Sequence, residues 1–192
     1  MSIYRKDMRG IIVDSFIEEF NLHGPKLTLD DVCARIHISK KTIYRNFNSK
    51  DDIYVYILED AVNQIRARQE EIYKDERLSI AEKLRAILTI ETSWESKIDL
   101  SRLHELSEES PKILAKILSA YEDSWEYLGK LLVEGLEAGV VKKDVHPKLV
   151  IAFLRADMEA LYDKGLLSES GLTYTQAISR LADFALEGIL VG

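Results

Sequence analysis

Apolar side chains recur every three or four residues along most of this chain, which is the spacing of an amphipathic helix. The first such stripe consists of Met8, Ile12, Phe16 and Phe20. His23 and Gly24 follow it, and a basic residue followed by glycine is a common helix ending. We therefore predict a helix over about residues 8–23.

Three short polar sequences predict the starts of the next three helices. In "TLDD", Thr28 can cap a helix together with Asp31, in the arrangement of a capping box. Ser39 can cap a third helix, and Ser49 a fourth that runs to about Tyr73. The second and third helices are therefore short and joined by a tight turn.

The rest of the chain carries the same helical signals. Two more capping boxes, "SIAE" and "TYTQ", mark helix starts. Further helices are expected near residues 79–97, 100–108, 110–138, 147–164 and 173–190. Only nine Gly and three Pro occur in 192 residues, so there are few turn-forming residues for a sheet. We predict an all-α fold in which three N-terminal helices precede a C-terminal helical bundle.

Composition narrows the cellular setting. The longest apolar run, "LVIAFL" at residues 149–154, is far shorter than the roughly 20 residues of a membrane-spanning helix. The N-terminus lacks an apolar signal segment, and the single cysteine, Cys33, excludes an internal disulfide. We therefore expect a soluble cytoplasmic protein with no membrane partner.

Charge is distributed unevenly along the chain. The formal net charge is −7, but residues 1–56 hold nine basic and eight acidic side chains, so the acidic excess lies in the remainder. Within "SKKTIYRNFNSK", residues 39–50, there is no acid. Its cations are Lys40, Lys41, Arg45 and Lys50. Two modules with different partners are indicated, and the first has a locally basic helix.

The third predicted helix has the chemistry of a DNA-reading helix. If Ile43 and Phe47 turn inward, residues 40–42 and 44–46 lie wholly or partly outward. Lys and Arg can contact guanine or neutralise phosphate, Asn can pair with adenine, and a Thr methyl can touch thymine. The second helix of a helix-turn-helix presents such groups to the major groove. On the residues alone, a solvated charged helix face fits equally well.

Residues 8–57 combine an aromatic-bearing helix, a glycine, a threonine-capped helix and a "hydrophobic-S-x-x-T-hydrophobic-Y-x-x-F" run at fixed spacing. The matching positions are Phe16, Phe20, Gly24, Thr28, Val32, Ile38, Ser39, Thr42, Ile43, Tyr44, Phe47, Lys50 and Ile53. This pattern resembles the N-terminal helix-turn-helix domain of the TetR family of bacterial transcriptional regulators. The chain departs from the family at His37 and Lys41, where glycine is usual.

The resemblance implies a helix-turn-helix DNA-binding domain over residues 1–48, and a ligand-sensing and dimerisation domain over residues 49–192. It also implies that Thr28 and Lys50 anchor phosphates and that Tyr44 grips the DNA backbone. The DNA-binding candidates are Thr28, Ser39, Lys40, Lys41, Thr42, Tyr44, Arg45, Asn46 and Lys50.

The resemblance further implies that the last two helices pair with their copies in a homodimer, although an internal bundle face is the alternative. The dimer-interface candidates are Val150, Phe153, Leu154, Leu161, Ala177, Ile178, Leu181, Ala185 and Gly188. Some aromatic, sulfur-containing or acidic side chains of the middle helices are core residues by default, but they are also ligand-pocket candidates. These are Glu91, Trp94, Tyr121, Trp125, Met158 and Tyr162.

No catalytic motif, metal-ligand spacing or phosphate-binding loop occurs in the sequence, so we expect no enzymatic activity, no metal and no cofactor. The predicted function is a DNA-binding regulator, a repressor that releases a pseudo-palindromic operator in double-stranded DNA when a small-molecule effector binds. The alternative is a helical ligand-binding or adaptor protein whose helix-turn-helix no longer binds DNA.

Overall fold

The computed structural model describes residues 7–94, 97–99, 102, 105–120, 122–161 and 164–191. Within these ranges the chain forms α-helices and short 3-10 turns, and the β-type pairing is an isolated antiparallel bridge between Val141 and Leu190. The predicted all-α fold is confirmed. None of the described helices is long and apolar enough to cross a membrane.

The chain packs as two compact units. The first comprises residues 1–61 and 93–119, and the second comprises residues 62–92 and 120–192. Residues 93–119 therefore pack with the N-terminal helices although they follow α5 in sequence. The functional boundary between residues 48 and 49 stays a prediction.

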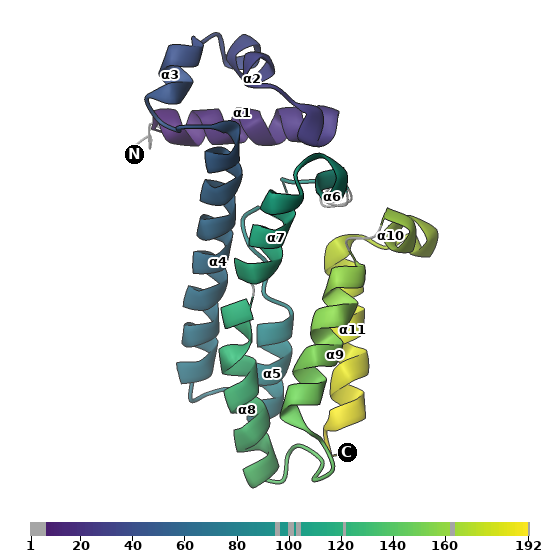
Figure 1. Ribbon diagram of the computed structural model, residues 1–192. Helices are drawn as coiled ribbons and strands as arrows, with labels where there is room; N and C mark the ends of the chain where they lie inside the picture. Colours follow the sequence, from purple (N-terminus) through teal and green to yellow (C-terminus); the bar gives the residue numbers. More distant parts are fainter. Residues whose placement is uncertain are drawn as a thin grey trace. The chain divides into compact units, whose positions relative to one another are not determined.

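The first unit holds the short N-terminal helices (Figure 1). Its elements are α1 (Met8–His23), η1 (Gly24–Lys26), α2 (Leu29–Ile36), α3 (Lys40–Tyr44), the first part of α4 (Lys50–Lys74), α6 (Leu106–Glu109) and most of α7 (Pro111–Ala120). The predicted stripes of α1 and α4 meet in its core. There Phe16 lies edge to face with Tyr54, with ring centroids 4.8 Å apart.

The second unit is a helical bundle. It contains the rest of α4, α5 (Ile80–Leu88), η3 (Glu122–Trp125), α8 (Glu126–Glu137), α9 (Pro147–Ala160), α10 (Lys164–Ser170) and α11 (Tyr174–Ile189). The helix α8 packs against α5 and α9, and α11 packs against the same two helices. Leu84, Leu131 and Leu132 are fully buried among them.

The helix expected over residues 79–97 is shorter than predicted, because α5 ends at Leu88. Thr89 donates its hydroxyl hydrogen to the carbonyl of Arg85 at 2.9 Å, and its own backbone is no longer helical. Thr89 and Ile90 are β-branched, and such side chains lose rotamer freedom in a helix. The following segment leaves the helical path.

The helix expected over residues 110–138 is instead three elements, α7, η3 and α8. The amide of Gln69 in α4 donates to the carbonyl of Ser124 at 2.8 Å, a contact across 55 positions that local spacing does not predict. The helix α9 ends at Ala160, and α10 was not predicted. Four residues of the helix expected over residues 100–108 lie outside the described residues, which show α6 from Leu106.

Candidate DNA-binding surface

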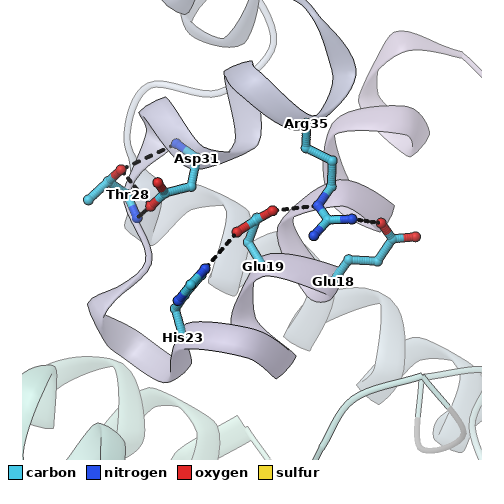
Figure 2. Close-up of polar contacts among 6 residues, drawn as sticks. All are labelled: Glu18, Glu19, His23, Thr28, Asp31 and Arg35. Carbon is cyan, nitrogen blue, oxygen red and sulfur yellow. Dashed lines mark hydrogen bonds and ion pairs between the residues drawn. The ribbon is translucent and has the colours of Figure 1, made fainter.

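A network of charged side chains holds α2 against α1 (Figure 2). The carboxylate of Glu19 is buried in α1 and is hydrogen-bonded by Nε of Arg35 from α2. Nη1 of Arg35 lies 2.9 Å from Oε2 of Glu18, and Nε2 of His23 lies 3.3 Å from Oε2 of Glu19. A buried carboxylate is costly unless it is paired. The hydrogen bond from Arg35 to Glu19 therefore fixes α2 on α1, and it raises the pKa of Arg35.

The start of α2 is the predicted capping box (Figure 2). Oγ1 of Thr28 accepts from the amide of Asp31 at 3.3 Å, and Oδ2 of Asp31 accepts from the amide of Thr28 at 2.7 Å. These bonds hold the pKa of the Asp31 carboxyl below its ordinary value, with the side-chain bond from Thr28 as the largest cause. The start of α2 is therefore set by the local sequence.

The turn after α2 is formed by His37, which replaces the usual glycine. His37 is left-handed, with φ 53° and ψ 46°, and its amide donates to the carbonyl of Cys33. The amide of Ile38 donates to the same carbonyl at 3.1 Å. A non-glycine residue in this conformation is strained, but the turn between α2 and α3 is retained.

The third helix is oriented as predicted. Oγ of Ser39 accepts from the amide of Thr42 at 3.3 Å, and Ile43 and Phe47 are buried. The guanidinium of Arg9 lies 4.7 Å from the ring centroid of Phe47 and 4.6 Å from that of Tyr56. Because α3 is anchored by its inner face, its outer face is presented to solvent.

The outer face carries Lys41, Tyr44 and Arg45, which are all exposed. Tyr44 exposes 54% of its surface. Within the part of the chain that the structure describes, no ion pair or hydrogen bond occupies the side chain of Lys41 or Arg45. An ammonium and a guanidinium without internal partners are available to phosphate oxygens and guanine edges.

Lys40 already has an acidic partner. Its Nζ lies 2.8 Å from Oδ2 of Asp30, in the first turn of α2. The hydrogen bond to Asp30 raises the pKa of Lys40. Sequence reasoning missed this pair because the two residues are on different helices. The positive charge of Lys40 is therefore partly offset before any partner binds.

Two polar candidates, Asn46 and Thr42, are half-buried and make hydrogen bonds within their own segment. Nδ2 of Asn46 donates to the carbonyl of Thr42 at 2.8 Å. Oγ1 of Thr42 lies 3.2 Å from Oγ of Ser39. These contacts fix the side chains beside the free cations, and a role in base reading stays a prediction.

The polar groups of the two expected phosphate anchors already have hydrogen-bond partners in the first unit. The hydroxyl of Thr28 donates to Oδ2 of Asp31 at 2.7 Å. Nζ of Lys50 donates to the carbonyls of Pro25 and Leu27, at 2.7 and 3.1 Å. In this arrangement, neither side chain is free in the way that Lys41 is.

The structure does not bring the ligand-pocket candidates together in one described cluster. Glu91 is exposed and lies beyond the end of α5, where helical spacing no longer applies. Nε1 of Trp94 donates to Asp60 at 2.8 Å within the first unit. Trp125 and Met158 belong to separate apolar clusters of the second unit. Tyr121 and Tyr162 lie outside the described residues.

The dimer-interface candidates divide into buried and exposed groups. Inside the protomer, the buried members are Leu154, Leu161, Ala177 and Ile178. They have little surface left for a partner, as the alternative of an internal bundle face predicts. Half-buried members are Val150, Leu181 and Ala185, and exposed ones are Phe153 and Gly188. Sequence reasoning missed the most exposed apolar residues nearby, Leu149 on α9 and Phe184 on α11, which expose 68% and 69% of their surface.

A long-range contact at the end of α1 was also missed. Nδ2 of Asn21 donates to the carbonyl of Lys97 at 2.6 Å, and Oδ1 of Asn21 accepts from the amide of Asp99 at 2.8 Å. At Gly24, a Cβ atom would lie 2.3 Å from Oε2 of Glu105. Segments more than 75 positions apart are thus joined within the first unit, and no local motif indicates that contact.

Comparisons with known proteins agree with this geometry. Residues 12–57 match the family described as bacterial regulatory proteins, tetR family. The chain is 20% identical over 166 residues to YvaF, an uncharacterized HTH-type transcriptional regulator of Bacillus subtilis (strain 168), and the match covers 86% of this chain and 87% of that protein.

Solved structures share the fold at low sequence identity. SmeT in complex with triclosan has a TM-score of 0.71 at 22% identity, covering 95% of this chain and 91% of that one. FadR from Bacillus subtilis in complex with stearoyl-CoA has a TM-score of 0.67 at 19% identity, covering 92% and 95%. Both similarities extend over the C-terminal helices as well as the N-terminal ones.

Proposed function

We propose that the chain, whose residues 12–57 match the family described as bacterial regulatory proteins, tetR family, is a homodimeric repressor that releases its operator when a small molecule binds. The observation that carries the proposal is the outer face of α3. A capped, inwardly anchored helix presents Lys41, Tyr44 and Arg45 to solvent, next to a short turn and a second helix. This is the geometry in which a helix-turn-helix enters the major groove.

The electrostatics of this face favour DNA over an acidic protein partner. The chain as a whole is acidic, with a formal net charge of −7, so non-specific attraction to DNA is weak away from α3. The two free cations of this face, Lys41 and Arg45, lie about one helical turn apart. Tight binding therefore requires that this turn of helix enter a DNA groove. A flat acidic protein surface offers no such groove.

A homodimer is supported by the exposed apolar surface of α9 and α11. Leu149, Phe153 and Phe184 are large side chains that expose more than half of their surface. Apolar side chains gathered on two packed helices favour contact with a second copy. A two-fold dimer would present two α3 helices, and its operator would be a pseudo-palindrome with half-sites about one helical turn or a multiple apart.

A small-molecule effector is supported by the two solved relatives, whose structures contain triclosan and stearoyl-CoA. The hydrogen bonds of Asn21 with the backbone of Lys97 and Asp99 connect α1 to the segment after α5, so ligand binding that moves this segment would also move α1. Residues 93–119 continue from α5 yet pack with α1. A ligand that prefers the conformation with lower DNA affinity shifts the population toward it, and by linkage DNA weakens ligand binding by the same factor.

The proposal is tested by fluorescence anisotropy with the DNA upstream of the protein's own gene and a scrambled duplex of equal length. We expect selective binding of the upstream duplex at 0.15 M salt, and competition by an oligonucleotide carrying a palindrome found by footprinting. Triclosan and stearoyl-CoA serve as effector probes in the same assay. Equal binding of both duplexes, together with retained binding of either probe, would instead support a ligand-binding protein that no longer reads DNA.

A further inference from the structure

The first residue of α4, Lys50, is tied to the segment that leads into α2. Its Nζ donates to the carbonyl of Pro25 at 2.7 Å and to that of Leu27 at 3.1 Å. The lysine side chain spans 23 positions of sequence to reach Leu27. Its partial burial removes water from the ammonium and lowers the pKa of Lys50. The charge is therefore held by backbone dipoles.

The two carbonyls lie in the short segment between α1 and α2, directly before α2 begins. Pro25 is in the 3-10 turn η1, and Leu27 follows that turn and immediately precedes the cap residue Thr28. The side chain of Leu27 is fully buried. Neither carbonyl belongs to a helical ladder that continues, so each gains from an external donor. One ammonium satisfies both and joins the start of α4 to the start of α2.

We infer that Lys50 is a positioning residue, which holds the start of α2, and through the His37 turn the outer face of α3, in the orientation that reads DNA. The inference rests on the proposed function, and it replaces the phosphate-anchoring role that the family resemblance implies for this lysine. The carbonyls of Pro25 and Leu27 already take two of the three N–H donors of Nζ, and the salt dependence of binding tests whether the third meets a phosphate.

The two roles differ in what they do to DNA binding. A phosphate contact contributes equally to every sequence and adds about 0.9 to the salt slope of the binding constant. A positioning contact contributes where base edges must be met, so its loss lowers operator affinity more than non-specific affinity. Lys50→Met keeps the apolar stem and removes the ammonium, and Lys41→Met is a matched change at an exposed cation.

The experiment measures binding of operator and scrambled duplexes across a salt series for wild type, Lys50→Met and Lys41→Met, at a temperature where all three are folded by circular dichroism. Amide hydrogen exchange of residues 28–36 is measured without DNA. For Lys50→Met we expect faster exchange, an unchanged salt slope, and a fall in the operator-to-scrambled ratio of about tenfold, similar to one mismatched base pair.

For Lys41→Met we expect a salt slope lower by about 0.9 per half-site and unchanged exchange in α2. A slope that falls by about 0.9 per half-site in Lys50→Met overturns the inference, and so does unchanged exchange or an unchanged specificity ratio. If wild type prefers no sequence, the proposed function fails. In that case unchanged exchange still overturns the structural contact of Lys50, and faster exchange preserves the contact while removing its role in DNA reading.

Discussion

The outer face of α3 in the first unit exposes charged side chains to solvent. The exposed face of α9 and α11 in the second unit exposes apolar side chains instead. Ile43 of α3 and Phe47, which follows the helix, are buried, whereas Lys41, Tyr44 and Arg45 are exposed. On α9 and α11 it is phenylalanine that is exposed, at Phe153 and Phe184. Exposed charge remains well solvated, whereas clustered apolar surface gains free energy when it is covered. The first surface suits a charged partner, and the second suits another protein surface.

The largest effect is expected from a substitution in the exposed apolar surface of α11. Phe184→Glu places a charge in the proposed contact between subunits, where an unpaired carboxylate is costly. We expect the dimer dissociation constant to rise by about 30-fold or more, a loss of about 2 kcal/mol, as for a central interface residue. Sedimentation velocity over a concentration series measures this change.

Because Phe184 exposes 69% of its surface in the protomer, the helical circular dichroism of the variant should be unchanged. Glu187→Gln is the control, since Glu187 is exposed on the same helix and its change adds no charge. A folded Phe184→Glu protein with the same dimer constant as Glu187→Gln would remove α11 from the interface.

The two regions also differ in how far the sequence predicts them. In the first unit, the Thr28 capping box, the Ser39 cap and the inward side of α3 all follow from contacts within four residues, and each is confirmed. The expected roles of Lys40 and Lys50 depend on partners elsewhere, Asp30 and the carbonyls before α2. Contacts between side chains on different helices produce no periodic pattern in the sequence, so residue spacing does not predict them.

In the second unit, capping boxes and apolar periodicity predicted the starts of helices better than their ends. The capping boxes at Ser79 and Thr173 are confirmed, but α5 ends early and the helix expected over residues 110–138 is broken. The bond from Gln69 to Ser124 is one of the tertiary contacts at that break. Helical periodicity identifies an apolar stripe, but it does not say whether the stripe meets its own bundle or a second copy.

A smaller effect tests the turn of the first unit. His37 is left-handed at φ 53°, a conformation that glycine adopts without strain. We expect His37→Gly to raise the free energy of unfolding by about 0.5–1 kcal/mol, because relief of strain exceeds the added freedom of the unfolded chain. Urea unfolding measures this change. His146→Gly, outside the helix-turn-helix, should give no such gain, and a destabilised His37→Gly protein would show that the imidazole itself supports the turn.

The smallest expected effect concerns the acid beside the cations of α3. Asp30→Asn removes the charge that pairs with Lys40, so more positive charge faces DNA. Since both side chains are mostly exposed, the pair is weak, and we expect operator affinity to rise only about two- to fivefold. Titration by anisotropy at 0.1 M salt measures it. Glu59→Gln makes the same change in net charge at an exposed position of α4, and an equal gain in that control would assign the effect to net charge alone.

The central claim is that the outer face of α3 binds DNA through Lys41 and Arg45. Its most direct test is the salt dependence of operator binding for Lys41→Met, Arg45→Met and the control Lys143→Met, an exposed lysine of the second unit. If each α3 cation neutralises one phosphate in a half-site, each variant should lower the slope by about 0.9 per half-site, and Lys143→Met should leave it unchanged. Identical slopes for all three variants and wild type would contradict the claim.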